Sequence, residues 1–207
     1  MLAGLVPAAR VVGVTYLVDD PGISNVAGHY PEQVARTRAE IEALLALRPD
    51  LVLVSTHSDA IAVRMLLSAG VAVARFPAFD SFEEVARNLW LLGELLGVPG
   101  AAREVVAEME MRLAAVREAV VGRARPGVLY YSLSGSTGGP GTLTDEMIQL
   151  AGGYNLVRET GIEGYQRITR ELAIALQPEV VILSDWSGGN DPAAAQQLRT
   201  DPAWQAV

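Results

Sequence analysis

The chain has 207 residues, a formal net charge of −8 and 19% charged side chains, a composition typical of a folded globular protein rather than a disordered one. All sixteen positive side chains are Arg, and both Lys and Cys are absent. These absences exclude a phosphate-loop lysine, a Schiff base, a thiol nucleophile, disulfides and cysteine zinc sites. The excess of acid argues against nucleic-acid binding. Only His29 and His57 offer imidazoles, so we expect no resident metal or cofactor.

The N-terminal part begins with a β-branched run at residues 11–14, which predicts a buried strand. Thr37 and Glu40 have the spacing of a capping box, and the apolar residues that follow at helical spacing predict a helix that Pro49 ends.

A continuous apolar run at residues 51–54 predicts the next strand. Ser58 or Asp59 is expected to cap a helix that reaches Leu67, and residues 71–76 predict a further strand. Strands that alternate with helices in this order indicate a parallel sheet with crossover helices, so the fold class is α/β.

The middle of the chain predicts two consecutive helices. Ser81 and Glu84 form a second capping box, opening a helix that runs to Leu96. Residues 101–121 contain neither Gly nor Pro and carry an apolar stripe, which predicts one long helix of roughly 30 Å.

The α/β pattern then starts again, which predicts a second lobe. Its expected elements are a strand at 128–131, a Gly- and Ser-rich loop at 135–142, helices at 145–151 and 170–176, and a strand at 180–183. We therefore divide the chain into an N-terminal lobe at 1–98, a linking helix at 99–125 and a C-terminal lobe at 126–207.

The two lobes share an internal repeat without a gap. Residues 42–55 read EALLALRPDLVLVS, and residues 171–184 read ELAIALQPEVVILS. A helix, a Pro stop and a buried strand explain the apolar and Pro positions. They do not explain why both segments begin with a charged residue of the kind that usually lies at the surface, Glu42 in one and Glu171 in the other.

The order and spacing of several segments resemble the helical-backbone substrate-binding proteins of ABC importers, which carry iron-siderophores, heme or cobalamin. The resemblance covers nearly the whole chain, and its most specific pieces are VVGVTYLVDDP at 11–21, EALLALRPDLVLV at 42–54, FDSFEEVARNLWLLGELLG at 79–97, AGGYNLV at 151–157 and TRELAIALQPEVVIL at 169–183.

This resemblance implies two Rossmann-like lobes joined by a long rigid helix, with the ligand held between them. It implies that Glu42 and Glu171 dock onto arginines of the importer's membrane subunits. It also implies a periplasmic or extracellular location, with or without a membrane anchor. Family members begin earlier and end later than these residues and carry a secretion signal, so we expect the chain to be truncated at both ends.

Loops at the carboxyl ends of parallel strands converge on the ligand crevice of α/β proteins. From these loops we select eight candidate ligand-binding residues: Tyr16, Asp20, His57, Phe79, Tyr131, Tyr165, Arg167 and Trp186. Flat aromatic rings suit a large planar chelate.

The Asp-Asp-Pro at 19–21, placed after the first strand, resembles the cobalamin-binding members of the family slightly more than the others, so the resemblance implies cobalamin first. Heme comes next, because His57 beside Tyr16 offers an axial ligand. A ferric siderophore would rely on the arginines, here Arg36, Arg38 and Arg167.

An enzyme or nucleotide-binding domain is the main alternative, because residues 135–142 form a glycine-rich loop between a strand and a helix. The segment lacks the spacing and the lysine of nucleotide loops, so we expect a flexible cleft loop. The chain also has no GxSxG nucleophile elbow. We therefore expect a non-enzymatic receptor, while an adaptor or sensor role stays open.

Overall fold

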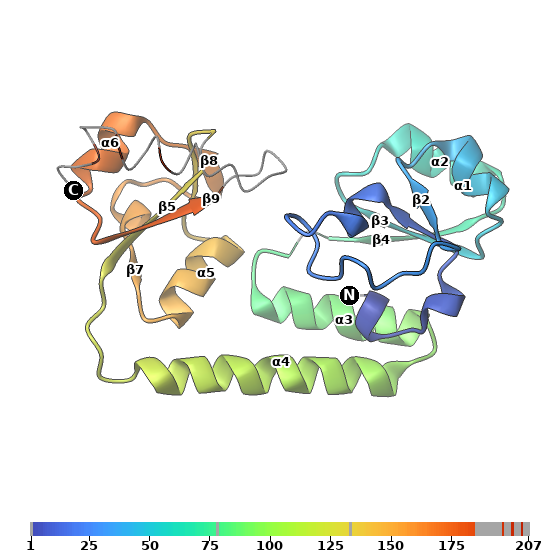
Figure 1. The fold of residues 1–207 in the computed structure, drawn as a ribbon, viewed down its shortest axis with the longest axis horizontal. Coiled ribbons are helices and arrows are strands. Elements are labelled where there is room, and N and C mark those ends of the chain that lie inside the picture. Colours follow the sequence, from blue (N-terminus) through green and yellow to red (C-terminus); the bar gives the residue numbers. More distant parts are fainter. Residues whose placement is uncertain are drawn as a thin grey trace. The chain divides into compact units, whose positions relative to one another are not determined.

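The computed structural model describes residues 2–77, 79–132 and 134–184 together with the single residues 196, 200 and 204. Its contacts divide the chain into two compact units (Figure 1). Unit 1 comprises Met1–Ala78 and Ala86–Val106, and unit 2 comprises Phe79–Val85 and Ala107–Val207. The lobe boundaries expected from the sequence stay a prediction.

Unit 1 contains strands at the three predicted places and one short strand, residues 35–37, that was not predicted. Strand β1 (Gly13–Thr15) pairs in parallel with β2 (Ala35–Thr37), and β3 (Leu51–Ser55) pairs in parallel with β4 (Ala72–Phe76). A long connection between β1 and β2 packs Val18, Tyr30 and Val34 into a small buried cluster. The α/β order predicted from hydrophobic runs is therefore confirmed for unit 1.

The helices of unit 1 begin and end close to the predicted residues, with one correction. Helix α2 (Ala60–Ser68) is capped at its N-terminus by Asp59, whose carboxylate accepts from two backbone N–H groups of the first turn. Helix α1 (Ile41–Ala46) is instead preceded by Glu40, which makes no side-chain cap. The predicted capping box at Thr37 is wrong, because Thr37 ends β2 and its Oγ1 accepts from the backbone N–H of Ala39.

Two long helices follow in the order predicted. Helix α3 (Phe82–Leu95) begins after Ser81, whose Oγ accepts from the backbone N–H of Glu84 at 3.2 Å. Helix α4 (Pro99–Val120) runs without interruption (Figure 1). No helix among the described residues is both long enough and apolar enough to cross a membrane.

Unit 2 is built on a three-stranded parallel sheet in the order β7-β5-β9. Strand β5 (Gly127–Ser132) lies in the centre, between β7 (Tyr154–Asn155) and β9 (Val180–Ser184). Leu129, Val157, Ile168 and Ala173 form the buried hydrophobic cluster of this unit. Two helices, α5 (Leu143–Leu150) and α6 (Arg170–Ala175), complete the pattern predicted for the second half of the chain.

The Gly- and Ser-rich segment at 135–142 differs from the flexible loop that we expected. Residues Ser136–Gly138 form strand β6, which pairs antiparallel with β8 (Tyr165–Arg167). Beyond it, Gly139 donates to the carbonyl oxygen of Gly164, and Gly164 donates to that of Pro140, both at 2.9 Å. The segment forms an ordered ribbon because its backbone groups are paired with a segment about thirty residues away, a pairing that local composition does not encode.

The repeat found in the sequence is also a structural repeat. Helix α1 leads to β3, and helix α6 leads to β9, with the same number of residues in each helix. After both helices one residue adopts a left-handed backbone conformation before the proline, Arg48 in the first copy and Gln177 in the second, each with φ of 47°. Since left-handed residues other than Gly are uncommon, this match supports a true structural equivalence.

Candidate functional site

In unit 1, the residues that follow β1 and β2 bring an aromatic ring and a cation together. Tyr16 comes directly after β1 and is 43% exposed, and Arg38 comes directly after β2. The Arg38 guanidinium carbon lies 4.0 Å from the centroid of the Tyr16 ring. A cation above an exposed aromatic face contributes about 0.5–1 kcal/mol, enough to favour this stacked arrangement. The pair forms a flat, positively charged platform at the carboxyl edge of the strands.

Arg36 holds the long β1–β2 connection in place. Its guanidinium donates to both carboxylate oxygens of Asp19 at 2.8 Å and to the backbone carbonyl oxygens of Tyr30 and Pro31 at 2.9 Å. The hydrogen bond from Arg36 lowers the pKa of Asp19, and the same bond raises that of Arg36. Because its donors are used within the loop, Arg36 is not available as a cation for an anionic ligand.

The other candidates of unit 1 have local roles. Asp20 accepts from the backbone N–H of Gly22 at 2.8 Å, which closes the turn in the Asp-Asp-Pro-Gly segment. His57 is exposed and lies in a turn after β3, where its backbone N–H donates to Ser55 Oγ.

In unit 2, β8 presents Tyr165 and Arg167, both exposed. They are two residues apart on a strand, so they project on the same face. Tyr165 is 57% exposed, yet its hydroxyl lies 3.0 Å from Thr144 Oγ1 on α5. The contact fixes the direction of the Tyr165 ring, although more than half of the residue is exposed.

The remaining candidates are Phe79, Tyr131 and Trp186. Phe79 is 45% exposed and belongs by its contacts to unit 2. Tyr131 is half-buried and packs against the hydrophobic cluster, with its ring centroid 5.4 Å from that of Trp204. Trp186 lies outside the described residues.

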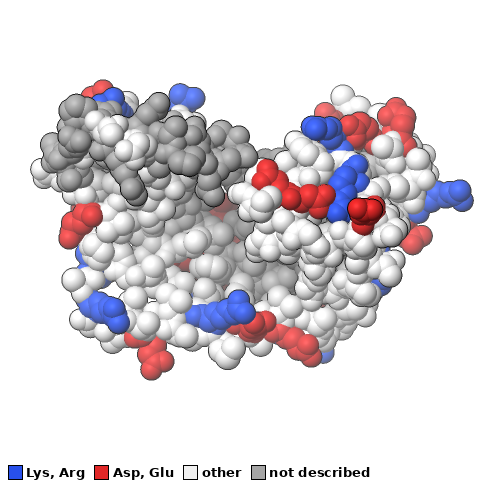
Figure 2. Space-filling model, in the orientation of Figure 1, with Lys and Arg blue, Asp and Glu red and all other residues white. Residues whose placement is uncertain are grey.

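Arg38 was only a siderophore candidate in the sequence, but the repeat carries a signal for it. Extending the repeat four residues upstream of Glu42 and Glu171 pairs Arg38 with Arg167. Each of these arginines follows or ends a strand and precedes a short helix. On the face drawn in Figure 2, arginines of the described residues are scattered among acidic side chains rather than gathered in a broad basic surface.

Glu42 and Glu171 occupy the same place in the two copies of the repeat. Each lies in the first turn of its short helix, and each is exposed. A carboxylate at this end of a helix is favoured by the helix dipole. Both side chains are therefore available to a basic partner surface.

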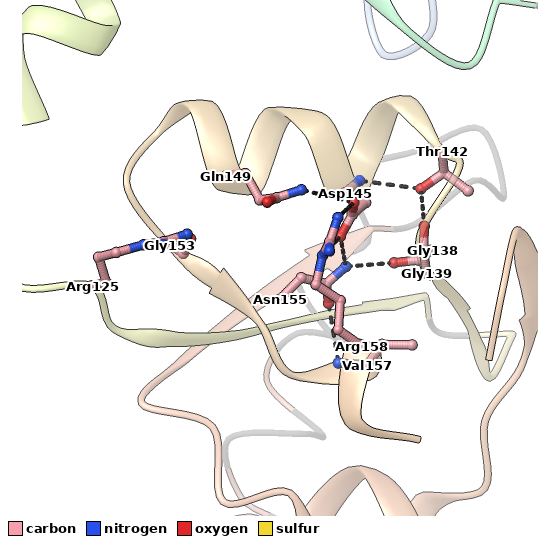
Figure 3. A network of polar contacts seen from close by, with 10 residues as sticks. All are labelled: Arg125, Gly138, Gly139, Thr142, Asp145, Gln149, Gly153, Asn155, Val157 and Arg158. Carbon is pink, nitrogen blue, oxygen red and sulfur yellow. Dashed lines mark hydrogen bonds and ion pairs between the residues drawn. The ribbon is translucent and has the colours of Figure 1, made fainter. Parts of the chain in front are cut away.

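A buried acid in α5 was not foreseen (Figure 3). Asp145 is only 3% exposed, and Arg158 donates to both of its carboxylate oxygens, through Nε at 2.9 Å and through Nη2 at 2.6 Å. Burial raises the pKa of Asp145, but the hydrogen bonds from Arg158 and Asn155 outweigh it and leave the pKa below its usual value. An acidic residue in the first turn of a helix is ordinary, so this network has no recognisable signal in the sequence.

The described residues bring no three His, Asp or Glu side chains together as a metal-binding group. Aromatic rings, arginines and hydroxyls are the groups presented, and these bind by stacking and hydrogen bonding. The arrangement is suited to holding a ligand.

Comparison with known proteins gives a consistent result. A family profile described as "Periplasmic binding protein" matches residues 2–207. A cobalamin-binding protein of Halobacterium salinarum is 35% identical over 179 residues, which are 83% of this chain and 47% of the relative. The chain thus spans about half the length of that curated relative.

Solved structures agree on the fold. A periplasmic heme-binding protein from Pseudomonas aeruginosa has a TM-score of 0.75 and 30% identity, over 95% of this chain and 71% of that one. The periplasmic vitamin B12 binding protein of Vibrio cholerae has a TM-score of 0.66 over 99% of this chain and 76% of its own, and its 23% identity shows the fold alone. The α/β class predicted from the sequence is confirmed.

Proposed function

Because the chain belongs to the periplasmic binding protein family, we propose that it captures a metal chelate and delivers it to the membrane subunits of an ABC importer. The observation that carries this proposal is the placement of exposed Tyr and Arg side chains beside one another in each unit, Tyr16 with Arg38 and Tyr165 with Arg167. Large planar chelates need flat surfaces with a few fixed polar groups.

Cobalamin is the first candidate ligand. The curated relative from Halobacterium salinarum is described as a cobalamin-binding protein. A corrin is recognised through its flat faces and its amide groups, which suit aromatic rings and hydroxyl donors. Tyr16, Phe79 and Tyr165 are exposed aromatic residues that would contact it, and Trp186 is a further proposed contact.

Heme is the second candidate, favoured by the platform of Tyr16 and Arg38. A tyrosine phenolate is an established ligand for heme iron, and a guanidinium pairs with a carboxylate. The stacked geometry holds both groups within one small surface. A ferric siderophore ranks third, because the donors of Arg36 are used by its own loop.

For the transport partner, we propose that Glu42 and Glu171 contact basic residues of the membrane subunits. Their exposure and their equivalent places at the starts of α1 and α6 support this role. Charged rim contacts mainly steer encounter and specify the partner. The site of action would be outside the cytoplasmic membrane, in keeping with the family.

A nucleotide-binding enzyme that uses residues 135–142 is poorly supported. The backbone of this segment is paired with residues 164–168, and a Cβ added at Gly139 would clash with the carbonyl oxygen of Ile162. The N–H group of Gly139 is used by the carbonyl oxygen of Gly164 and is therefore not presented to a phosphate.

The proposal is tested by titrating the protein with cyanocobalamin, hemin and a ferric hydroxamate, followed by absorbance and thermal melting. A ligand that binds only the folded protein raises its melting temperature. We expect saturable binding of cyanocobalamin or hemin together with a higher Tm. Absence of binding by all three chelates would contradict the proposed ligand class.

A further inference from the structure

A buried polar network in unit 2 is centred on Asp145 (Figure 3). Each carboxylate oxygen accepts two hydrogen bonds. Oδ1 accepts from Asn155 Nδ2 at 2.8 Å and from Arg158 Nε at 2.9 Å, while Oδ2 accepts from Gln149 Nε2 at 2.9 Å and from Arg158 Nη2 at 2.6 Å. Since four donors satisfy this buried acid, its side chain has one well-defined orientation.

The network reaches the end of β6 by two routes. Asn155 is fully buried, and its Nδ2 also donates to the carbonyl oxygen of Gly138 at 2.9 Å. Thr142 accepts from the backbone N–H of Asp145 at 3.1 Å and donates to the carbonyl oxygen of Gly139 at 2.8 Å. The Gly138 carbonyl is therefore held from β7, and the Gly139 carbonyl is held by the residue that caps α5.

These two glycines in turn hold Tyr165. Gly138 is the partner of Tyr165 in the antiparallel pairing of β6 with β8, and Gly139 donates to the carbonyl oxygen of Gly164. The Tyr165 hydroxyl contacts Thr144, the neighbour of Asp145 on α5, at 3.0 Å. Tyr165 is thus fixed at its backbone and at its hydroxyl, although its side chain is more than half exposed.

We propose that Asp145 is a positioning residue that holds the β6–β8 ribbon so that Tyr165 is presented to the ligand in one orientation. This inference rests on the proposed function, since it takes Tyr165 as a ligand contact. An exposed aromatic side chain that is already ordered loses less conformational entropy on binding, and the ligand then binds more tightly. Capping the eight-residue helix α5 does not require four hydrogen bonds to one buried carboxylate.

The first measurement needs no ligand. Asp145→Asn replaces two carboxylate acceptors by one acceptor and a donor that faces other donors. We expect faster amide hydrogen exchange at residues 134–142 and 162–168 in the folded variant. Glu108→Gln, which removes the negative charge from an exposed pair with Arg112 on α4, is the matched control and should exchange as the wild type does. Unchanged exchange in both segments of Asp145→Asn would overturn the inference.

The second measurement uses the affinity of the folded protein for cyanocobalamin and hemin. We expect Asp145→Asn to weaken binding roughly tenfold in the wild-type protein. In a protein that already carries Tyr165→Leu, the same substitution should weaken binding much less. A merely structural role would lower stability and leave the affinity of the folded fraction unchanged. Equal affinity in wild type and Asp145→Asn, or additive effects in the double variant, would overturn the positioning role.

A milder variant covers the case in which Asp145→Asn does not fold. Arg158→Lys keeps the charge but cannot pair with both carboxylate oxygens in a fork, so the same changes are expected at smaller size. If the wild type binds none of the chelates, the proposed function fails and the ligand part of this inference fails with it. The exchange measurement would then still decide whether Asp145 orders the ribbon.

Discussion

Arg48 and Gln177 have the same left-handed backbone conformation, with φ of 47° in each, at equivalent positions of the two repeat copies. Each lies two residues after the end of a short helix and precedes a proline, so the chain turns from helix to strand in the same way twice. The repeated sequence therefore encodes a repeated turn in addition to a hydrophobic pattern.

This turn predicts how substitutions at Gln177 act. A β-branched side chain is strongly disfavoured at positive φ, whereas glycine adopts it without a steric cost. Gln177→Val should lower the free energy of unfolding by about 1–2 kcal/mol. Gln177→Gly should be neutral or more stable, as measured by urea denaturation. Equal stability of the two variants would show that the conformation at this position carries no cost.

The Asp145 network predicts a dependence of stability on acid pH. Although burial acts in the opposite direction, the donors from Arg158 and Asn155 hold the pKa of Asp145 below its usual value. Such a group adds stability that is complete above the unfolded pKa, about 3.9, and is lost as the pH falls toward the folded pKa. Asp145→Asn should be less stable than wild type by roughly 2–3 kcal/mol at neutral pH, with a smaller difference below about pH 4.

Urea denaturation at a series of pH values checks this expectation. Glu108→Gln serves as the control, because its pair on α4 is exposed and contributes little. A difference between wild type and Asp145→Asn that stays constant down to about pH 3 would rule out the ion pair as the source of the effect.

The Tyr16–Arg38 platform predicts discrimination between the two leading ligands. Hemin carries carboxylates, and a charge-assisted hydrogen bond from Arg38 to one of them would be lost in Arg38→Gln. We expect roughly tenfold weaker hemin binding and a smaller change for cyanocobalamin, measured by absorbance titration. Arg112→Gln, on the exposed face of α4, is the control for loss of a positive charge. Equal losses for both ligands would argue against a carboxylate contact at Arg38.

The paired glutamates predict a separation of binding from delivery. Glu42→Arg together with Glu171→Arg should abolish stimulation of the importer's ATPase in proteoliposomes while leaving chelate affinity unchanged, because both residues lie in the first turns of short helices and neither is a proposed ligand contact. Glu104→Arg together with Glu110→Arg, at two exposed acids on α4, controls for the same change in net charge. Normal stimulation by the double variant would refute the docking role.

Local patterns in the sequence predicted most of the fold. The long apolar stripe of α4, the capping of α2 by Asp59 and the strands at β3, β4 and β5 depend on residues close in the chain, so their spacing alone reveals them. β2 and the β6–β8 ribbon were missed because they are short and are stabilised by pairing with distant segments.

What the sequence determined by itself is the α/β order, the repeat and the resemblance that leads to the family. Only the tertiary structure decided which charged groups are free to bind. Arg36 and Arg38 are two residues apart and look alike in the sequence, yet Arg36 is used by Asp19 and the loop carbonyls while Arg38 stacks on Tyr16. The physical reason is that a side chain's partners depend on where distant backbone segments come to lie, and residue spacing carries no record of that.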